Sequence, residues 1–280
     1  MISVIICSRT KDIPQSLKDN IAETIGIEYE LIVIDNSKNR YSIFTAYNEG
    51  VQLSKYPYLC FMHNDILFQT GNWGQQVIEH FKDEKVGCIG VIGSHFIPNT
   101  PTGWASSDII SGQIQNNEGL IQKDLSRMTT SIIDVVAVDG VWFCIPKEVI
   151  RFVKFDNIIF DGFHVYDIDI CLQIRQFDYK VCVVSNILIK HLSDGDWNLQ
   201  WLDSTEKLYQ KWKCLLPQFA GTVLTEEEIK IRTSLVKNIF LWQKEYCICK
   251  DKLSRIQNSL AYKLGKIQLK PFSIIKRKIK

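Results

Sequence analysis

The chain has 280 residues, of which 46% are hydrophobic and 23% are charged, and its formal net charge is +2. These values are ordinary for a globular enzyme and give no indication of nucleic-acid binding. No apolar run reaches the roughly 18 residues that a membrane span needs. The first residues lack the basic leader of a signal peptide, so we expect a cytoplasmic protein. The nine cysteines are odd in number and mostly isolated in apolar runs, which predicts free buried thiols.

Strands and helices are predicted to alternate over the first 62 residues. Residues 2–7 are a β-branched run typical of a strand buried on both faces, and residues 16–26 show helical spacing. Residues 29–36 predict a second strand, 42–55 a second helix and 58–62 a third strand. This alternation indicates parallel βαβ units with right-handed crossovers.

Each of these three strands is followed by polar residues. The groups are Ser8-Arg9-Thr10, Asp35-Asn36-Ser37 and His63-Asn64-Asp65. Ligands of open parallel sheets bind in the crevice beyond the carboxyl ends of the strands. We therefore predict one crevice that is lined by all three groups.

The middle of the chain continues this pattern less regularly. We predict a helix over 72–83, a strand over 86–93, and loops with short strands over 94–133 that face a substrate. Residues 133–146 predict two strands that turn at Asp139-Gly140. A helix is expected over 166–179, followed by a strand region that ends at His191.

The C-terminal part is predicted to be helical and basic. Residues 204–216 predict a helix with Ser204 as its cap, and Thr225 and Glu228 have capping-box spacing at the start of another. From 239 to 280 there are 11 Lys and Arg against 2 Asp and Glu, so the remainder of the chain is net negative. Such a tail can lie on an anionic membrane surface at the inner face of the membrane. The alternative is a solvated tail without a partner.

Seven motifs resemble those of family 2 glycosyltransferases of the GT-A fold. In order, they are "SVIICSRT", "ELIVIDNS", "AYNEG", "LCFMHND", "VDGVWFCIPKEV", "FDGFHVYDIDICLQIRQ" and "IKHLSDGDW". The last two are most similar to the branch named after the streptomycin biosynthesis protein StrF. The resemblance spans roughly residues 2–215 and implies an α/β fold with a mixed, mostly parallel sheet flanked by helices. We therefore divide the chain into a GT-A domain, 1–216, and a basic helical extension, 217–280.

The resemblance implies transfer of a sugar from a nucleotide-sugar donor, with UDP as the first expectation, to a hydroxyl acceptor. The acceptor would be a glycan or lipid-linked molecule in cell-surface polysaccharide biosynthesis, and the anomeric configuration would invert. A divalent cation, Mn²⁺ or Mg²⁺, would stabilise the leaving diphosphate. Asp65 matches the last residue of the family's Asp-x-Asp metal motif, and His191 matches a further metal ligand. His63 stands where the family has the first Asp.

The resemblance also assigns the donor site and the base, and positions near the base suggest the acceptor side. The residues matching the donor site are Ser8, Arg9, Asp35, Asn48, His63, Asn64 and Asp65. Asp167 matches the general base, in a motif where Tyr166 replaces the family's Glu, and a positioned base is what an acceptor hydroxyl requires. On the acceptor side we place Gly140, Trp142 and His164.

Structural roles are the alternative for several of these residues. Asp35 and Asp65 are suited to strand-end turns, and Asp167 and Asp169 to the start of a helix, where one of them would be the cap. His191 would then be a structural histidine and Trp142 part of the core.

Two other functional classes remain open. A nucleotidyltransferase would carry a Gly-rich basic loop after the first strand, whereas "SRTKDIPQ" contains no glycine. A non-catalytic nucleotide-sugar-binding protein would fit the replacement of an acid by His63, although Asp167 is retained.

Overall fold

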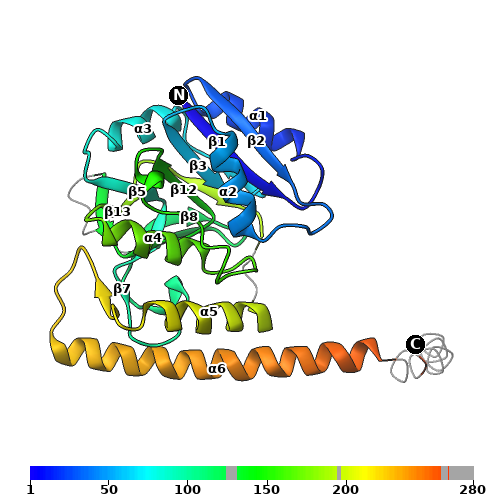
Figure 1. Ribbon diagram of the computed structural model, residues 1–280, viewed down its shortest axis with the longest axis vertical. Helices are drawn as coiled ribbons and strands as arrows, with labels where there is room; N and C mark the ends of the chain where they lie inside the picture. The colour runs from blue at the N-terminus through cyan, green and yellow to red at the C-terminus, as the bar shows by residue number, and fades with distance from the viewer. Residues whose placement is uncertain (124–130, 194–196, 260–263, 265–280) are drawn as a thin grey trace, which may run out of the picture.

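A seven-stranded mixed sheet forms the centre of the computed structural model, which describes residues 1–123, 131–193, 197–259 and 264 (Figure 1). Its spatial order is β10-β13-β5-β12-β3-β1-β2. The bounds are β1 Ile2–Ser8, β2 Tyr29–Asp35, β3 Tyr58–Met62, β5 Val86–Gly90, β10 Ile132–Val135, β12 Trp142–Pro146 and β13 Lys180–Val184. β2 and β3 both pair in parallel with β1, as the βαβ prediction requires. β12 is antiparallel to β3 and makes the sheet mixed.

A second, six-stranded sheet contains strands from the region predicted to be largely loop. Its order is β11-β6-β8-β14-β4, with β9 paired to β8. The bounds are β4 Ile66–Phe68, β6 Ile92–Ser94, β8 Ile110–Gln115, β9 Leu120–Lys123, β11 Ala137–Val138 and β14 Ile189–His191. The region predicted as one strand pair, 133–146, contains three strands, because β11 leaves the first sheet and pairs with β6. Residues 124–130 lie outside the described residues.

Helices cover the sheet, and one of them, α5, starts well before its predicted position. Their bounds are α1 Gln15–Thr24, α2 Ile43–Leu53, α3 Trp73–His80, α4 Tyr166–Gln176, α5 Leu199–Trp212 and α6 Glu226–Asn258, with short 3₁₀ turns at Trp104–Ser106 and Val149–Arg151. The predicted cap Ser204 is wrong, because α5 begins earlier and Asn198 caps it by accepting from the Trp201 N–H. The capping box of Thr225 and Glu228 is confirmed.

Before the last helix begins, a short strand of the chain pairs with a strand of the main body. β15, Gln218–Phe219, pairs antiparallel with β7, Phe96–Ile97. The buried His95 ring lies between these segments, 2.8 Å from the Ala220 carbonyl and 2.8 Å from the Ser111 hydroxyl. The first residues of the predicted extension therefore pack on the body, and α6 then runs beneath α5 and projects beyond it (Figure 1).

Apolar side chains fill both faces of the central sheet, which is why its strands are almost continuously hydrophobic. Gly50 of α2 is part of this packing, since a Cβ there would lie 2.3 Å from Cγ2 of Ile5 on β1. All nine cysteines are free, and six of them are buried, in line with the thiol prediction. Among the described residues, no helix is both long and apolar enough to cross a bilayer.

Candidate active site

Three side chains come together where β3 and β14 end. His63, Asp65 and His191 each place one ligand atom within 4.8 Å of the others. Strand pairing causes this meeting, because β14 is antiparallel to β4 with His191 opposite Ile66, and the Leu192 N–H donates to the Asp65 carbonyl at 2.9 Å. Asp65 and His191 are the predicted metal residues, and the structure adds His63 to them. Two imidazoles and one carboxylate fit a transition metal such as Mn²⁺ better than Mg²⁺, which prefers oxygen ligands.

The Asp65 carboxylate is held in its charged form. Burial alone would raise its pKa, but hydrogen bonds from His191 and Ser193 outweigh this effect and hold the pKa well below its usual range. The Ser193 hydroxyl donates to Oδ2 at 2.6 Å, and Nε2 of His191 lies 3.5 Å from Oδ1. An ionised carboxylate is the form that a cation requires.

The orientation of the His63 ring follows from its partner Tyr166. The Tyr166 hydroxyl donates to the Gly140 carbonyl at 3.0 Å, so it must accept from Nε2 of His63, 2.8 Å away. The lone pair of the neutral ring is then on Nδ1, which lies 3.8 Å from Oδ1 of Asp65. Burial lowers the pKa of His63 to about 4, which keeps the ring neutral at neutral pH. Tyr166 thus orients the ring of His63, as an outer hydrogen-bond partner does for the histidines of metal sites.

Gly140 connects this group to Asp167. Its carbonyl accepts from Tyr166, and its N–H donates to Oδ2 of Asp167 at 2.9 Å. A Cβ at Gly140 would lie 2.3 Å from the Tyr166 hydroxyl, so only glycine fits this turn. Hydrogen bonds therefore run without interruption from His63 through Tyr166 and Gly140 to the predicted base.

The Asp167 carboxyl is poised to exchange a proton near neutral pH. It is only 8% exposed, and burial together with the negative charge of Asp139 raises its pKa to about 7. Hydrogen bonds from the Ile168 and Gly140 N–H groups act in the opposite direction. Burial also raises the pKa of Asp139, whose Oδ1 accepts from the Val141 N–H at 2.9 Å. A pKa close to the working pH suits a general base.

The start of α4 fixes where Asp167 points. Val165 occupies the cap position with φ of 62° and ψ of 6°, a left-handed conformation that is rare for a β-branched residue. Asp169 lies in the first turn as expected, but Asp167 lies there too, so the expectation that one of the two caps the helix is wrong. Carboxylates in a first turn interact favourably with the helix dipole. Backbone strain such as that at Val165 persists only where surrounding contacts impose it. At this position it comes directly before Tyr166 and Asp167 in the chain.

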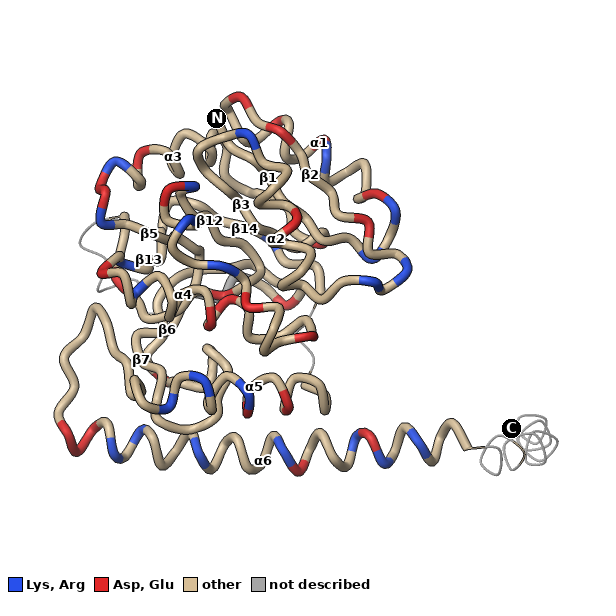
Figure 2. Tube along the Cα trace, viewed as in Figure 1, with Lys and Arg blue, Asp and Glu red and all other residues tan. Residues whose placement is uncertain are grey.

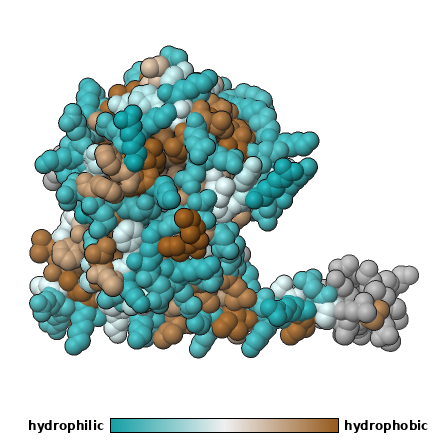
Figure 3. Space-filling model, in the orientation of Figure 1, coloured by the Kyte–Doolittle hydropathy of each residue, from teal (hydrophilic) through white to brown (hydrophobic). Residues whose placement is uncertain are grey.

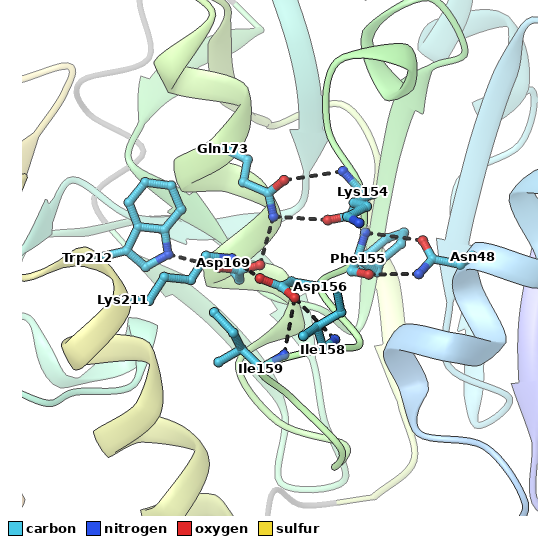
Figure 4. A network of polar contacts seen from close by, with 10 residues as sticks. All are labelled: Asn48, Lys154, Phe155, Asp156, Ile158, Ile159, Asp169, Gln173, Lys211 and Trp212. Carbon is cyan, nitrogen blue, oxygen red and sulfur yellow. Dashed lines mark hydrogen bonds and ion pairs between the residues drawn. The ribbon is translucent and has the colours of Figure 1, made fainter.

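Asp169 anchors α4 to α5 (Figure 4). This carboxylate is 1% exposed and accepts from Trp212 Nε1 at 2.8 Å, from Gln173 at 2.8 Å and from the Lys211 ammonium at 2.7 Å. Lys211 also pairs with Asp156 at 2.8 Å. Burial raises the pKa of Asp169, while Lys211 and Trp212 stabilise its charge. Asp169 is thus used in structural contacts, which leaves Asp167 as the acid of this turn that is hydrogen-bonded to Gly140.

Asn48 belongs to the same network and is a correction to the predicted donor site. Its amide donates to the Phe155 carbonyl at 2.7 Å and accepts from the Phe155 N–H at 3.2 Å (Figure 4). Both ends of the amide are therefore used by the backbone. Together with the packing role of Gly50, this shows a structural Asn-x-Gly rather than a donor contact.

Trp142 is a second correction. It is 0% exposed and packs edge-on against Phe68 and Trp73, so it has no face for an acceptor. Gly140 is buried as well and meets Tyr166 and Asp167 instead. His164 is partly exposed in the loop just before α4, close in sequence to the base.

The remaining predicted donor residues lie at the carboxyl ends of β1, β2 and β3. Asp35 is opposite Ser8 in the strand register, is exposed, and accepts from the Ser37 N–H at 2.9 Å. This bond and the Ser37 hydroxyl lower the pKa of Asp35. The buried Ser8 hydroxyl accepts from the Thr10 N–H and lies 3.5 Å from the Asn64 amide, so it shapes the turn, while Arg9 is exposed.

Sequence inspection missed three residues of this site. Tyr166 was noted only as a replacement, Asp139 only as part of a turn, and Ser193 not at all. The signal for Tyr166 and Asp139 was their adjacency to Asp167 and Gly140, but the contact between the two segments is visible only in the fold.

Comparisons with known proteins identify the family and the fold. A family model described as "Glycosyltransferase like family" matches residues 3–212, and the chain belongs to that family. The structure of GalNAc-T7 with UDP, GalNAc and Mn²⁺ is similar over 89% of this chain and 57% of that one, at 14% identity and a TM-score of 0.52. The chain thus spans little more than half of GalNAc-T7.

The mannosyltransferase PcManGT from Pyrobaculum calidifontis, in complex with GDP-Man and Mn²⁺, is similar over 98% of this chain and 80% of that one, at 10% identity and a TM-score of 0.53. No curated protein shows significant similarity to the sequence. At these identities the structural likenesses establish the GT-A fold, here ending in a long C-terminal helix.

Proposed function

We propose that this protein is an inverting, metal-assisted glycosyltransferase with Asp167 as its general base. The observation that carries the proposal is the hydrogen-bonded path from the His63, Asp65 and His191 group through Tyr166 and Gly140 to Asp167. This path joins a cation site to a buried carboxyl at the sheet edge where open α/β folds bind ligands.

The donor end is formed by the strand termini. His63, Asp65 and His191 would hold a divalent cation, for which Mn²⁺ suits the mixed ligands, and when bound it stabilises the charge of a leaving diphosphate. Arg9, Asp35 and Asn64 lie around this position and are suited to the nucleoside and phosphates of the donor. Mn²⁺ accompanies UDP in GalNAc-T7 and GDP-mannose in PcManGT, so we test both nucleotides, with UDP as the first expectation.

The acceptor end is Asp167. Its carboxylate takes the proton of the acceptor hydroxyl while that oxygen bonds to the anomeric carbon of the sugar. The bond from this carbon to the diphosphate oxygen breaks, and the nucleoside diphosphate leaves. One displacement inverts the anomeric configuration. His164, in the loop before α4, is placed on the acceptor side.

The wider setting follows the resemblance to the StrF branch. We propose that residues 1–216 carry the catalysis, and that the product belongs to cell-surface polysaccharide synthesis with a glycan or lipid-linked acceptor. The basic residues of 259–280 would contact anionic lipid at the inner membrane face, since each adds about 1 kcal/mol near such a surface. Removing these residues should abolish sedimentation with phosphatidylserine vesicles and leave binding to neutral vesicles unchanged.

The first test is calorimetric titration of UDP, GDP and dTDP with and without Mn²⁺. We expect one nucleotide to bind in a Mn²⁺-dependent manner, and Asp65→Asn to abolish that dependence. Asp83→Asn is the matched control, because Asp83 is an exposed carboxylate that pairs with Lys180. Absence of binding for every nucleotide would show that these strand ends are structural only.

Catalysis is tested separately from binding. With the nucleotide known, the matching sugar donors are screened for transfer and for slow hydrolysis, and Asp167→Asn should bind donor normally yet lose both activities. Product NMR must show an inverted anomeric centre, and retention would refute the single displacement. Donor binding without transfer or hydrolysis would favour the non-catalytic alternative.

A further inference from the structure

The long helix α6 has an inner apolar seam that is buried against the body and an outer one that stays largely exposed. The body reaches the outer seam at Trp197, whose ring centroid lies 6.1 Å from that of Trp242 and 6.3 Å from that of Tyr246. The inner seam consists of the buried residues Val236, Phe240, Gln243 and Cys247. Within it, Phe240 and Cys247 form an apolar cluster with Trp201 and Leu202 of α5. This contact holds the middle of the helix against α5.

The outer seam repeats the same spacing one residue earlier. Its seven positions alternate in steps of four and three and are Leu235, Ile239, Trp242, Tyr246, Cys249, Leu253 and Ile256. All are exposed, and the six other than Cys249 are 42% to 58% accessible. Leu241 and Ile248 of α6 are also exposed, at 49% and 36%, but lie outside this line. Figure 3 shows hydrophobic residues among hydrophilic ones along the side of the molecule formed by α6. Alternating steps of four and three define the contact line of a coiled coil, whereas a lipid-facing helix needs only a broad apolar face.

The end of α6 also lacks support from the body. Beyond Lys250, whose ammonium reaches the Trp197 carbonyl at 3.5 Å, the helix projects away from α5 (Figure 2). A projecting helical segment of this length is marginal in water unless its apolar side is buried. Leu253 and Ile256 continue the outer seam along the projecting part, where α5 cannot cover them.

We propose that α6 pairs with α6 of a second copy of this chain as a parallel, in-register coiled coil along the outer seam. In heptad terms, Ile239, Tyr246 and Leu253 are a positions, and Leu235, Trp242, Cys249 and Ile256 are d positions.

Charge complementarity supports the parallel register. In this register the g residue of one helix faces the e residue found five positions later on the other helix. The two such pairs open to a second helix are Glu245 with Lys250 and Lys252 with Gln257, because Gln243 of the preceding pair is buried against the body. The Glu245–Lys250 pair joins opposite charges twice by symmetry. No like charges meet in these two pairs.

The oligomeric state of the full chain tests this proposal. We expect light scattering and sedimentation to give a dimer of the 32.4 kDa chain. Leu253→Glu combined with Ile256→Glu should weaken the dimer by at least about 100-fold, since four apolar side chains per dimer would become charged. These positions lie in the projecting end of α6, so the melting of the body should not change. Lys237→Glu, on the exposed side away from the seam, is the control and should remain dimeric.

Cysteine cross-linking tests the register. In a parallel, in-register pair the two Cys249 side chains meet across the axis, so mild oxidation should give a cross-linked dimer that Cys249→Ser abolishes. Cys214→Ser should not affect it, although Cys214 is also exposed. A monomer up to about 100 µM, a dimer that survives the double glutamate variant, or cross-linking through Cys214 would overturn the proposal. A monomer that binds phosphatidylserine vesicles through the outer seam would overturn it as well.

Discussion

Replacing Tyr166 by Phe tests whether the cation group and the base form one unit. The substitution keeps the ring but removes two hydrogen bonds, of 2.8 Å to His63 and 3.0 Å to Gly140. The freed His63 ring can then rotate or change tautomer, and loss of such an outer partner usually lowers metal affinity by about 10- to 100-fold. The Gly140 carbonyl loses its partner in a buried turn, which should reduce the free energy of unfolding by about 1–3 kcal/mol.

Two assays separate these effects. Calorimetry measures Mn²⁺ affinity in the presence of the cognate nucleotide, and urea denaturation measures stability. Tyr56→Phe is the control, because this exposed tyrosine also donates one hydrogen bond, at 2.7 Å to Glu28, far from the site. If the Tyr166 variant binds Mn²⁺ as tightly as the unmodified protein, His63 is not a ligand oriented by Tyr166, and the site as argued is wrong.

Four further predictions concern the base and its supports. The value of kcat/KM should rise with pH to a plateau above about 7 as Asp167 loses its proton; a profile that is flat between pH 5 and 8 would contradict this assignment. The pKa of Asp167 is higher in the folded protein than in the unfolded chain, so the unfolded chain loses this proton at lower pH. The free energy of unfolding should therefore fall as the pH rises from about 4 to 7, and Asp167→Asn should raise Tm at pH 7. Gly140→Ala should displace Tyr166 and lower transfer at least about 10-fold, as a donor transfer assay would show. Lys211→Met should lower the free energy of unfolding, measured in urea, by about 3–5 kcal/mol, because it leaves Asp169 buried without its cation. A decrease below about 1 kcal/mol would mean that the hydrogen bonds from Trp212 and Gln173 are enough to stabilise the Asp169 carboxylate.

The fold was predictable where local periodicity decides it. β1 to β3 and the helices between them follow from apolar runs and helical spacing, and their parallel pairing follows from the alternation. The second sheet was not predictable, because β6, β8 and β11 are short and are held only by partners distant in sequence. The start of α5 was missed for a similar reason, since Asn198 directly follows the apolar Trp197 and gave no periodic signal.

The site shows the same division between local and distant information. Strand ends together with the family resemblance pointed to Asp65 and His191, and the resemblance pointed to Asp167 at the start of a helix. The link between them requires Gly140 from one turn and Tyr166 from a helix 26 residues later. Asn48 and Trp142 were assigned to ligands because residue type and order cannot reveal that an amide is used by Phe155 or that an indole faces the core.

His63 changes the charge of the site as well as its geometry. With a neutral imidazole in place of the family's first aspartate, Asp65 is the one anionic group among the three side chains that meet there. A divalent cation held by this group keeps a net positive charge, whereas two carboxylates would neutralise it. Such a site holds free metal weakly and becomes favourable when a diphosphate supplies the missing negative charge. The replacement is therefore consistent with a working donor site in which metal and nucleotide bind together. Tyr166 suits this arrangement because it orients His63 without adding charge beside Asp167, whose pKa a second acid would raise further.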